Sequence, residues 1–248
     1  MRASGPAETI AHAQRTSLRA RSGREDVAGF AVVGQPFASG DLLCLRCFPA
    51  SSFGPGYISV WHRAKDERWT VYTNVAPDRS CPRFIGSAVS RVVETPIELQ
   101  WGGQFDLTAR IPAAQLIWKL HLANTLLTRL MNLMMAWTPA ALFESKLVLS
   151  AMSLISTRML AVGQLQLGGH VPNRQWFKAA PRNVWVVSSA TASLGDNDLG
   201  PQRALPTQAF LGEVPLPQSG IVMMGTFSFE AYTPERHLPP RPQSREIA

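Results

Sequence analysis

The sequence has few of the residues on which most recognisable sites depend. It contains only three cysteines, Cys44, Cys47 and Cys81, and only 17% of its residues are charged. An odd number of cysteines argues against a disulfide framework and for a reducing compartment, so we expect a cytoplasmic protein. The low charged fraction, together with 46% hydrophobic residues, excludes intrinsic disorder and a coiled coil for most of the chain.

Motifs of nucleotide-dependent and hydrolytic enzymes are also missing. The chain contains no P-loop, no G-x-G-x-x-G, no G-x-S-x-G and no H-E-x-x-H. The C-x-x-C formed by Cys44 and Cys47 lies in residues 42–48, a predicted strand in which residues three apart point to opposite faces. We therefore expect buried thiols there, with no metal and no cofactor.

Long apolar runs are absent as well. The longest uncharged stretch in the most apolar region, residues 130–143, has 14 residues and contains Pro139, whereas a spanning helix needs about 20 apolar residues. Residues 1–26 lack the apolar core of a secretory signal peptide. The net charge is +7, but Lys and Arg are not interleaved with aromatic residues along one face, so we expect no nucleic-acid partner.

Short apolar runs separated by turns make up most of the chain, and seven Trp fall mainly within them. This pattern predicts a flexible basic arm (1–26), a single β-rich domain (27–232) and a Pro- and Arg-rich tail (233–248). The expected class is α+β, mainly antiparallel β, with a lipocalin-like barrel or a barrel-like sandwich and an inserted helical hairpin. In one predicted β-hairpin, a three-residue loop at 102–104 places Trp101 opposite Phe105.

The helical hairpin is predicted at about residues 123–162, where alternation gives way to helical spacing. A polar stripe runs through Thr125, Thr128, Arg129 and Asn132 among apolar residues, and Thr138 followed by Pro139 predicts the start of a second helix. Five of the eight Met lie in this region. Three roles are open for the hairpin: ordinary core, a lid or wall of an apolar pocket, and contact with an anionic membrane surface.

Three residues are candidate acid–base groups. His62 shares one face of its predicted strand with apolar residues, so it is a core histidine unless the sheet encloses a cavity, where it becomes a general acid or base. Glu230 lies in an apolar strand and faces either outward or into such a cavity, and Tyr72 is the third candidate. Tyr57 projects from the face opposite His62, so at most one of the two lines a given cavity.

Aromatic side chains on the predicted strands are candidate walls for a hydrophobic ligand. Arg83 is a further candidate because it can bind an anionic group of the ligand. The alternative interpretation is that Arg83 forms an ordinary ion pair. The candidate substrate-binding residues are Tyr57, Trp61, Trp69, Arg83, Trp101, Trp118, Trp185 and Met131.

Two blocks carry a resemblance to a known family. Residues 48–63 (FPASSFGPGYISVWHR), followed by 69–73 (WTVYT), resemble the opening strands of lipocalin-like proteins of the carotenoid-hydratase (hydroxyneurosporene synthase) type. Residues 168–177 (GGHVPNRQWF) are similar to a glycine-to-Pro-Asn hairpin of such barrels. The resemblance implies binding of polyene or terpenoid molecules, with hydration, isomerisation or pericyclic cyclisation as the chemistry.

Three hypotheses of function follow. The first is a cofactor-independent enzyme, of the isomerase/cyclase or hydro-lyase type, acting on a polyene, terpenoid or polyketide-like molecule in a barrel cavity. The second is a non-catalytic lipid or pigment carrier, and the third a protein that docks on a membrane surface or a partner through the hairpin. A buried ionisable group in a cavity favours the enzyme, an all-apolar cavity the carrier, and an exposed apolar hairpin face over a solid core the docking protein.

Overall fold

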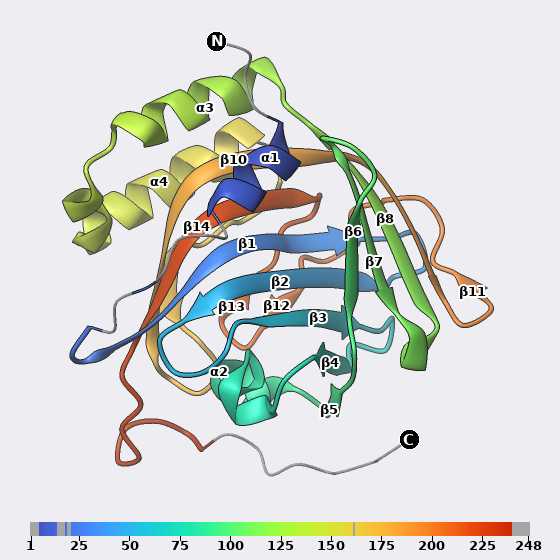
Figure 1. Ribbon diagram of the computed structural model, residues 1–248, viewed down its shortest axis with the longest axis horizontal. Helices are drawn as coiled ribbons and strands as arrows, with labels where there is room; N and C mark the ends of the chain where they lie inside the picture. The colour runs from blue at the N-terminus through green and yellow to red at the C-terminus, as the bar shows by residue number, and fades with distance from the viewer. Residues whose placement is uncertain (1–4, 14–17, 19–20, 161, 240–248) are drawn as a thin grey trace.

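A single curled sheet organises the protein in the computed structural model, which describes residues 5–13, 18, 21–160 and 162–239 (Figure 1). All strand pairs of its main path are antiparallel except β4 with β5. The predicted α+β class is therefore confirmed. In spatial order the strands are β5 (Arg91–Glu94), β4 (Trp69–Thr73), β3 (Tyr57–Arg63), β2 (Leu42–Ser51), β1 (Arg24–Pro36), β14 (Ile221–Glu230), β10 (Trp176–Leu194), β8 (Leu116–Ala123), β7 (Asp106–Ile111) and β6 (Glu98–Trp101).

The remaining elements are short strands and helices at the margins of this sheet. Strands β9 (Gly168–His170) and β11 (Asn197–Asp198) pair with β10, while β12 (Phe210–Leu211) and β13 (Val214–Pro215) pair with each other. The helices are α1 (Pro6–Ala13), η1 (Pro77–Arg79), α2 (Pro82–Ile85), η2 (Gly86–Ala88), η3 (Pro112–Ala114), α3 (Leu126–Trp137), η4 (Ala140–Glu144) and α4 (Lys146–Leu160).

The curl is barrel-like because the chain itself joins the two ends of the sheet. Strands β5 and β6 stand at opposite ends of the hydrogen-bonded path, yet residues 95–97 are all that separates them in the chain. Thr95 N donates to Thr73 O at 2.8 Å, which extends the pairing of this edge with β4. A sheet of ten strands whose ends are so closely tied must curve around an interior.

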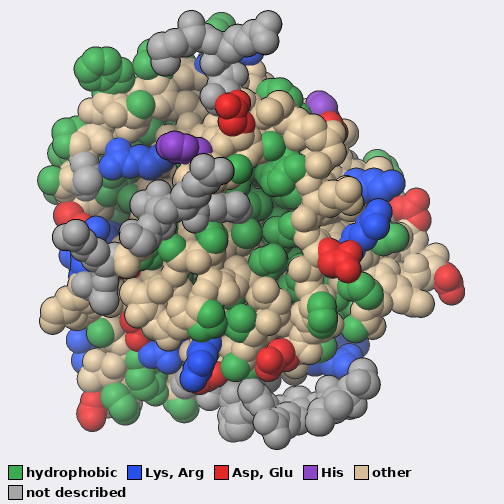
Figure 2. Space-filling view, in the orientation of Figure 1, with side chains coloured by type: hydrophobic (Ala, Val, Ile, Leu, Met, Phe, Trp, Pro, Cys, Tyr) green, Lys and Arg blue, Asp and Glu red, His purple; other side chains and the backbone are tan. Residues whose placement is uncertain are grey.

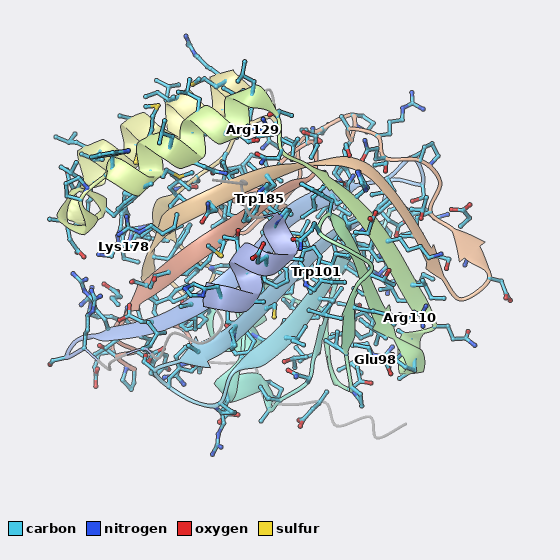
Figure 3. The ribbon with its side chains drawn as sticks, turned by 45° about the horizontal axis from the view of Figure 1, so that its top comes forward. Glu98, Trp101, Arg110, Arg129, Lys178 and Trp185 are labelled. Carbon is cyan, nitrogen blue, oxygen red and sulfur yellow. The ribbon has the colours of Figure 1, made fainter. Side chains whose placement is uncertain are left out.

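The inside of the curl is filled with side chains. In β8, Leu116, Trp118, Leu120 and Leu122 are buried and the residues between them are mostly exposed, the alternation expected of a strand with one buried face. Figure 3 shows Trp101 and Trp185 inside the curve of the sheet. The largest fully buried interior side chains are Trp118, Phe30, Phe37, Ile10, Leu43, Leu45, Leu107, Ile111 and Leu116.

Part of the N-terminal arm packs against this interior. Helix α1 places Ile10, 1% exposed, in the interior cluster, and Ala7 N donates to Gln104 O at 3.1 Å. Burying one isoleucine stabilises the attachment by about 1.5–3 kcal/mol. At the C-terminal end, the first residues of the tail pack against the domain, since Leu238 N donates to Asn173 O at 2.9 Å. Residues 240–248 lie outside the described part.

Two layers cover the outside of the sheet. Residues 77–89 and 205–216 lie on the outer face of β2–β4 and β14 and enclose a second cluster around Tyr57, Phe84 and Phe229. Helices α3 and α4 cover β10 and β14 and enclose a third, around Phe143 and Met223 (Figure 1).

The predicted helical hairpin is confirmed, but its second helix begins later than expected. Thr138 ends α3 instead of opening α4, and its Oγ1 donates to Met134 O at 2.9 Å. Pro139 precedes the short helix η4, and the second long helix begins at Lys146. The N-cap residue of η4 is Pro139, and no side chain caps that helix.

The β6–β7 register also differs from the prediction. Trp101 lies opposite Leu107 and not Phe105, because the turn spans five residues and Gly102 N donates to Asp106 O at 2.9 Å. Gly103, with φ at +124°, supplies a backbone conformation in this turn that favours glycine. A shift of two residues leaves every side chain on the predicted face.

Candidate ligand-binding site

Strands β2 and β3 present an unusual set of side chains to the outside of the curl. Their register pairs Cys44 with Trp61, Arg46 with Ser59 and Phe48 with Tyr57. Since side chains alternate along a strand, these six all stand on one face. Cys81, which directly precedes α2, reaches the same place, and its Sγ lies 3.6 Å from Tyr57 Oη.

An apolar cavity of about 90 Å³ lies above these residues. It is bounded by β1–β3 and β14 on one side and by segments 165–172 and 211–216 on the other. Its walls include Phe48, Phe227 and Phe229. The polar groups that line it are few, namely the side chains of Arg46, Tyr57, Trp61, Cys81 and Gln166.

A second cavity, of about 240 Å³, lies between the helical hairpin and the sheet. Leu165 and Met223 line both cavities, so the two adjoin there. Together they reach the lower end of the roughly 300–1,000 Å³ found for ligand sites. Methionine is adaptable and polarizable, which suits a wall that must fit flexible apolar molecules. The methionines of the second cavity are Met131, Met134, Met135, Met152, Met159 and Met223.

Arg46 is the charged group at the polar end of the first cavity. It is only 9% exposed, its Nη1 donates to Val32 O at 2.7 Å and to Leu45 O at 3.0 Å, and its guanidinium lies 4.2 Å from the Trp61 ring centre. Among the described residues no Asp or Glu pairs with it, and none accepts a hydrogen bond from its Nε or Nη2. Because a guanidinium stays charged, burial without an anion is costly.

The neighbours of Arg46 are neutral hydrogen-bonding groups. Burial raises the pKa of Tyr57 well above its ordinary value of 10.0 and also raises the pKa of Cys81, so both stay protonated at neutral pH. Ser59 and Trp61 face the Cys81 thiol, and the hydrogen bonds that they offer it act against the burial that raises its pKa.

Three of the candidates taken from the sequence line these cavities. Tyr57 and Trp61 stand in the first and Met131 in the second. Trp69 is buried in the outer cluster that also contains Tyr57 and Trp61, but it does not line the first cavity. Arg83 holds Glu25 through two bonds of 2.7 and 2.8 Å, which is the ion pair weighed as its alternative.

The other candidates lie inside the curl or at its end. Trp101, Trp118, Trp185 and Tyr72 belong to or pack on the interior cluster, and Glu230 bonds His237 and Arg236 at the end of β14. Their proposed roles in binding and catalysis stay predictions. The structure thus brings together Tyr57 and Trp61 from the predicted set, and it places the cavities outside the barrel interior.

His62 faces the interior side of β3, opposite Tyr57 as predicted, and its Nε2 lies 2.6 Å from Asp41 Oδ1. Burial raises the pKa of Asp41, but the hydrogen bonds from His62 and Ser39 outweigh it, and the pKa lies below its ordinary value. The pair forms a buried acid–imidazole contact away from both cavities.

Arg46 and Cys81 were missed as site residues in the sequence. Arg46 is the only charged residue in the apolar run 42–48, and a charge inside a strand buried on both faces is a signal of function or of a buried pair. Cys81 carries no such signal, because only the folding of α2 onto the sheet brings it to Tyr57. In the described part of the chain no three His, Cys, Asp or Glu side chains converge where a metal ion could bind.

The fold and these cavities define a barrel-like α+β protein with an apolar site on the outside of its sheet. No protein-family model matches the chain, and no curated protein matches it. Among solved structures, acetoacetate decarboxylase from Legionella pneumophila subsp. pneumophila str. Philadelphia 1 is similar, with a TM-score of 0.36 and 10% identity over 96% of this chain and 97% of that one.

Proposed function

We propose that the protein binds a hydrophobic small molecule that carries an anionic head group such as a carboxylate. The observation that supports this is Arg46, a buried cation without an anionic partner among the described residues, at the end of an apolar cavity. The head group accepts hydrogen bonds from the free Nε and Nη2 positions, and Tyr57 donates to it as a neutral hydroxyl. The apolar tail, of polyene, terpenoid or polyketide-like character, extends past Leu165 and Met223 into the second cavity.

The two parts of such a ligand contribute differently to binding. Apolar surface removed from water contributes about 25 cal/mol per Å², and this contribution does not distinguish one apolar molecule from another. A charge-assisted hydrogen bond in a low-dielectric site contributes about 1.5–3 kcal/mol. Selectivity for an acid over the matching alcohol therefore measures the contribution of Arg46.

A matched pair of polyenes tests the proposal. Retinoic acid and retinol share a chain and differ in the head group, and both quench tryptophan fluorescence, so titration gives both affinities. We expect the acid to bind about 10–100-fold more tightly than the alcohol. Arg46→Met should abolish this difference and leave retinol affinity within about threefold. The matched control is Arg83→Met, which removes an arginine that is already paired with Glu25 and should leave the difference intact.

Equal affinity of the native protein for the acid and the alcohol would show that Arg46 does not select the ligand. Failure of both polyenes, and of a panel of terpenoid acids, to bind would remove the proposed function. Co-purification of an acidic apolar molecule, detected by native mass spectrometry and organic extraction, would support it directly.

Catalysis on the bound molecule, by isomerisation, cyclisation or hydration without a cofactor, is a second candidate. It is favoured by the raised pKa of Tyr57 and of Cys81, because neutral donors beside a cation stabilise negative charge that develops on a ligand oxygen. The ionisable side chains of Arg46, Tyr57 and Cys81 in the cavity meet the criterion set above for an enzyme, but binding is placed first because the described lining of the first cavity contains no carboxylate or imidazole to act as a base. For a catalyst, Tyr57→Phe should lower turnover about 10²–10³-fold with a small change in affinity; a carrier returns every ligand unchanged in mass and isomer.

A further inference from the structure

Helix α3 turns its polar side toward the sheet. Asn132 lies on the predicted polar stripe, and its Oδ1 accepts from Val184 N at 2.7 Å while its Nδ2 donates to Val184 O at 3.1 Å. Thr128, one turn earlier, is fully buried. The side of the helix that a sequence pattern assigns to water therefore satisfies the backbone of β10.

Helix α4 is turned in the same way. Ser153 Oγ accepts from Leu167 N at 2.9 Å, and Thr157 Oγ1 accepts from Leu165 N at 3.0 Å. These hydroxyls hold the chain that returns from the hairpin to the sheet. In both helices, these polar side chains bind the protein backbone, while several large apolar side chains face outward.

The outward side is a broad apolar surface, which we call the hairpin face. Leu126 and Leu147 are each 83% exposed and Trp137 is 81% exposed. Figure 2 shows hydrophobic side chains along this margin of the molecule, where Figure 1 places α3. Exposed apolar patches of this kind mark interaction sites. The hairpin face consists of Leu126, Leu130, Leu133, Met134, Trp137, Leu142, Leu147, Leu154, Ile155 and Met159.

The charges around the hairpin face are positive. Arg129, Lys146 and Arg158 are exposed on the two helices, and Figure 3 shows Arg129 on α3, away from the interior tryptophans. The one acid between residues 126 and 160 is Glu144, and it is bound by Arg24 and Lys178. The positive charge beside the apolar surface is therefore unbalanced.

We infer that the hairpin face docks on an anionic lipid bilayer. Two helices that lie in the interface, with leucines and a tryptophan directed into the acyl boundary and Arg and Lys at the headgroups, match the known physics of interfacial helices. A second copy of the chain fits less well, because a two-fold interface brings the same positive rim against itself. Met134, Leu142, Ile155 and Met159 belong both to this face and to the second cavity, so a docked hairpin face places that cavity next to lipid.

Flotation with vesicles tests the inference. The protein should float with vesicles of 70:30 phosphatidylcholine:phosphatidylglycerol and bind pure phosphatidylcholine at least tenfold more weakly, with the difference shrinking in 0.5 M salt. Leu126→Asp with Leu147→Asp should lower partitioning at least tenfold without changing the melting temperature, because both side chains are already in water. Ile117→Asp with Phe210→Asp, at exposed apolar positions on β8 and β12, is the matched control and should bind like the native protein.

Charge is tested separately by Arg129→Gln with Arg158→Gln. We expect partitioning into the anionic vesicles to fall about thirtyfold, which is about 1 kcal/mol per charge, and binding to neutral vesicles to stay unchanged. Quenching of tryptophan by lipids brominated on the acyl chain should be strong in the native protein and much weaker in Trp137→Phe.

Absence of binding to the anionic vesicles, or equal binding by the Leu126→Asp/Leu147→Asp variant, overturns the inference. A dimer in light scattering that this variant dissociates, without vesicle binding by the native protein, overturns it too and assigns the face to a second copy. None of these measurements uses a ligand, so a failure here is distinct from a failure of the proposed ligand site.

Discussion

The two faces of the curled sheet are both apolar, but they are built for different purposes. Inside, Trp118 is 0% exposed and large side chains from β1, β2, β7 and β8 fill the space. Outside, the layers of helix and loop leave two adjoining cavities, and one of them contains the buried cation of Arg46. The comparison indicates that the interior supplies stability, whereas the outer face exchanges some packing for space and charge.

The two covering layers differ in a similar way. Residues 77–89 and 205–216 cover the sheet with buried aromatic and aliphatic side chains. Helices α3 and α4 pack on the apolar cluster around Phe143 and Met223, bind the backbone through hydroxyls and an amide, and keep most of their leucines in water. Because so much of their apolar surface stays in water, we expect this layer to open at lower free energy than the core does.

The largest effect that separates the faces is on stability. Trp118→Ala should lower the free energy of unfolding by about 3–5 kcal/mol, because it leaves a large hole in close-packed surroundings. Met131→Ala, in the wall of the second cavity, should lower it by about 1 kcal/mol or less, because that wall already borders empty space. Urea denaturation of both variants measures the difference. Equal losses would show that the hairpin layer is core.

A smaller effect of the opposite sign is expected at Arg46. Arg46→Met should leave the free energy of unfolding unchanged or raise it by about 1–2 kcal/mol, because it removes a buried charge without an anion. The lost bonds to Val32 O and Leu45 O and the stacking on Trp61 limit the gain. If urea denaturation shows a loss of 3 kcal/mol or more, Arg46 is a structural residue of the sheet.

Acid should loosen the hairpin layer before the interior. Hydrogen bonds from Arg24 and then Lys178 lower the pKa of Glu144 from 4.5 to about 2. Because the folded pKa of Glu144 lies below the unfolded one, its interactions with Arg24 and Lys178, which we call the Glu144 anchor, contribute stability above pH 4.5. That contribution is lost as the pH falls toward 2. Glu144 is partly exposed, so solvent screening keeps the contribution below about 1 kcal/mol.

Hydrogen exchange at pH 6 and pH 3 measures this loosening. Amides of η4 and α4 should exchange faster at pH 3, after correction for the intrinsic rate, while β8 amides change little. Glu144→Gln should already show the faster exchange at pH 6 and no further change at pH 3. An unaltered pH response in that variant would mean that another group controls the anchor.

Local patterns in the sequence predicted the elements well. Alternation located β8 and placed Tyr57 and His62 on opposite faces of β3, and the helical period located the hairpin. The same argument placed Cys44 and Cys47 on opposite faces, and they lie in different clusters. These results depend only on the geometry of neighbouring residues, which a single sequence contains.

The sequence pattern did not predict which face of a strand or helix packs against the rest of the protein. Residues 42–48 are buried throughout, so alternation could not tell which side of β2 would be the interior and which would border a cavity. In α3, periodicity found the polar stripe but not its direction, because the direction depends on the pairing of the Asn132 amide with the backbone N–H and C=O of Val184. Both outcomes depend on contacts between residues more than 50 positions apart.

The smallest expected effect is a difference in thiol reactivity between the two faces of the sheet. Cys81 lines the first cavity, whereas Cys47 is buried in the interior and burial raises the pKa of Cys44 to about 12 from 9.0. For Cys44, three units of pKa, partly offset by the greater nucleophilicity of a more basic thiolate, slow its reaction about 30–50-fold relative to an exposed thiol. Burial raises the pKa of Cys81 as well, but Cys81 lines a cavity that a small neutral reagent can enter, so methyl methanethiosulfonate should label it first at pH 8. Retinoic acid should slow that labelling in the native protein and not in Arg46→Met, because only a head group held at Arg46 keeps the reagent from the adjacent thiol.

Labelling of Cys47 ahead of Cys81 would instead mean that the interior opens more readily than the cavity, and the assignment of stability to one face and binding to the other would be reversed.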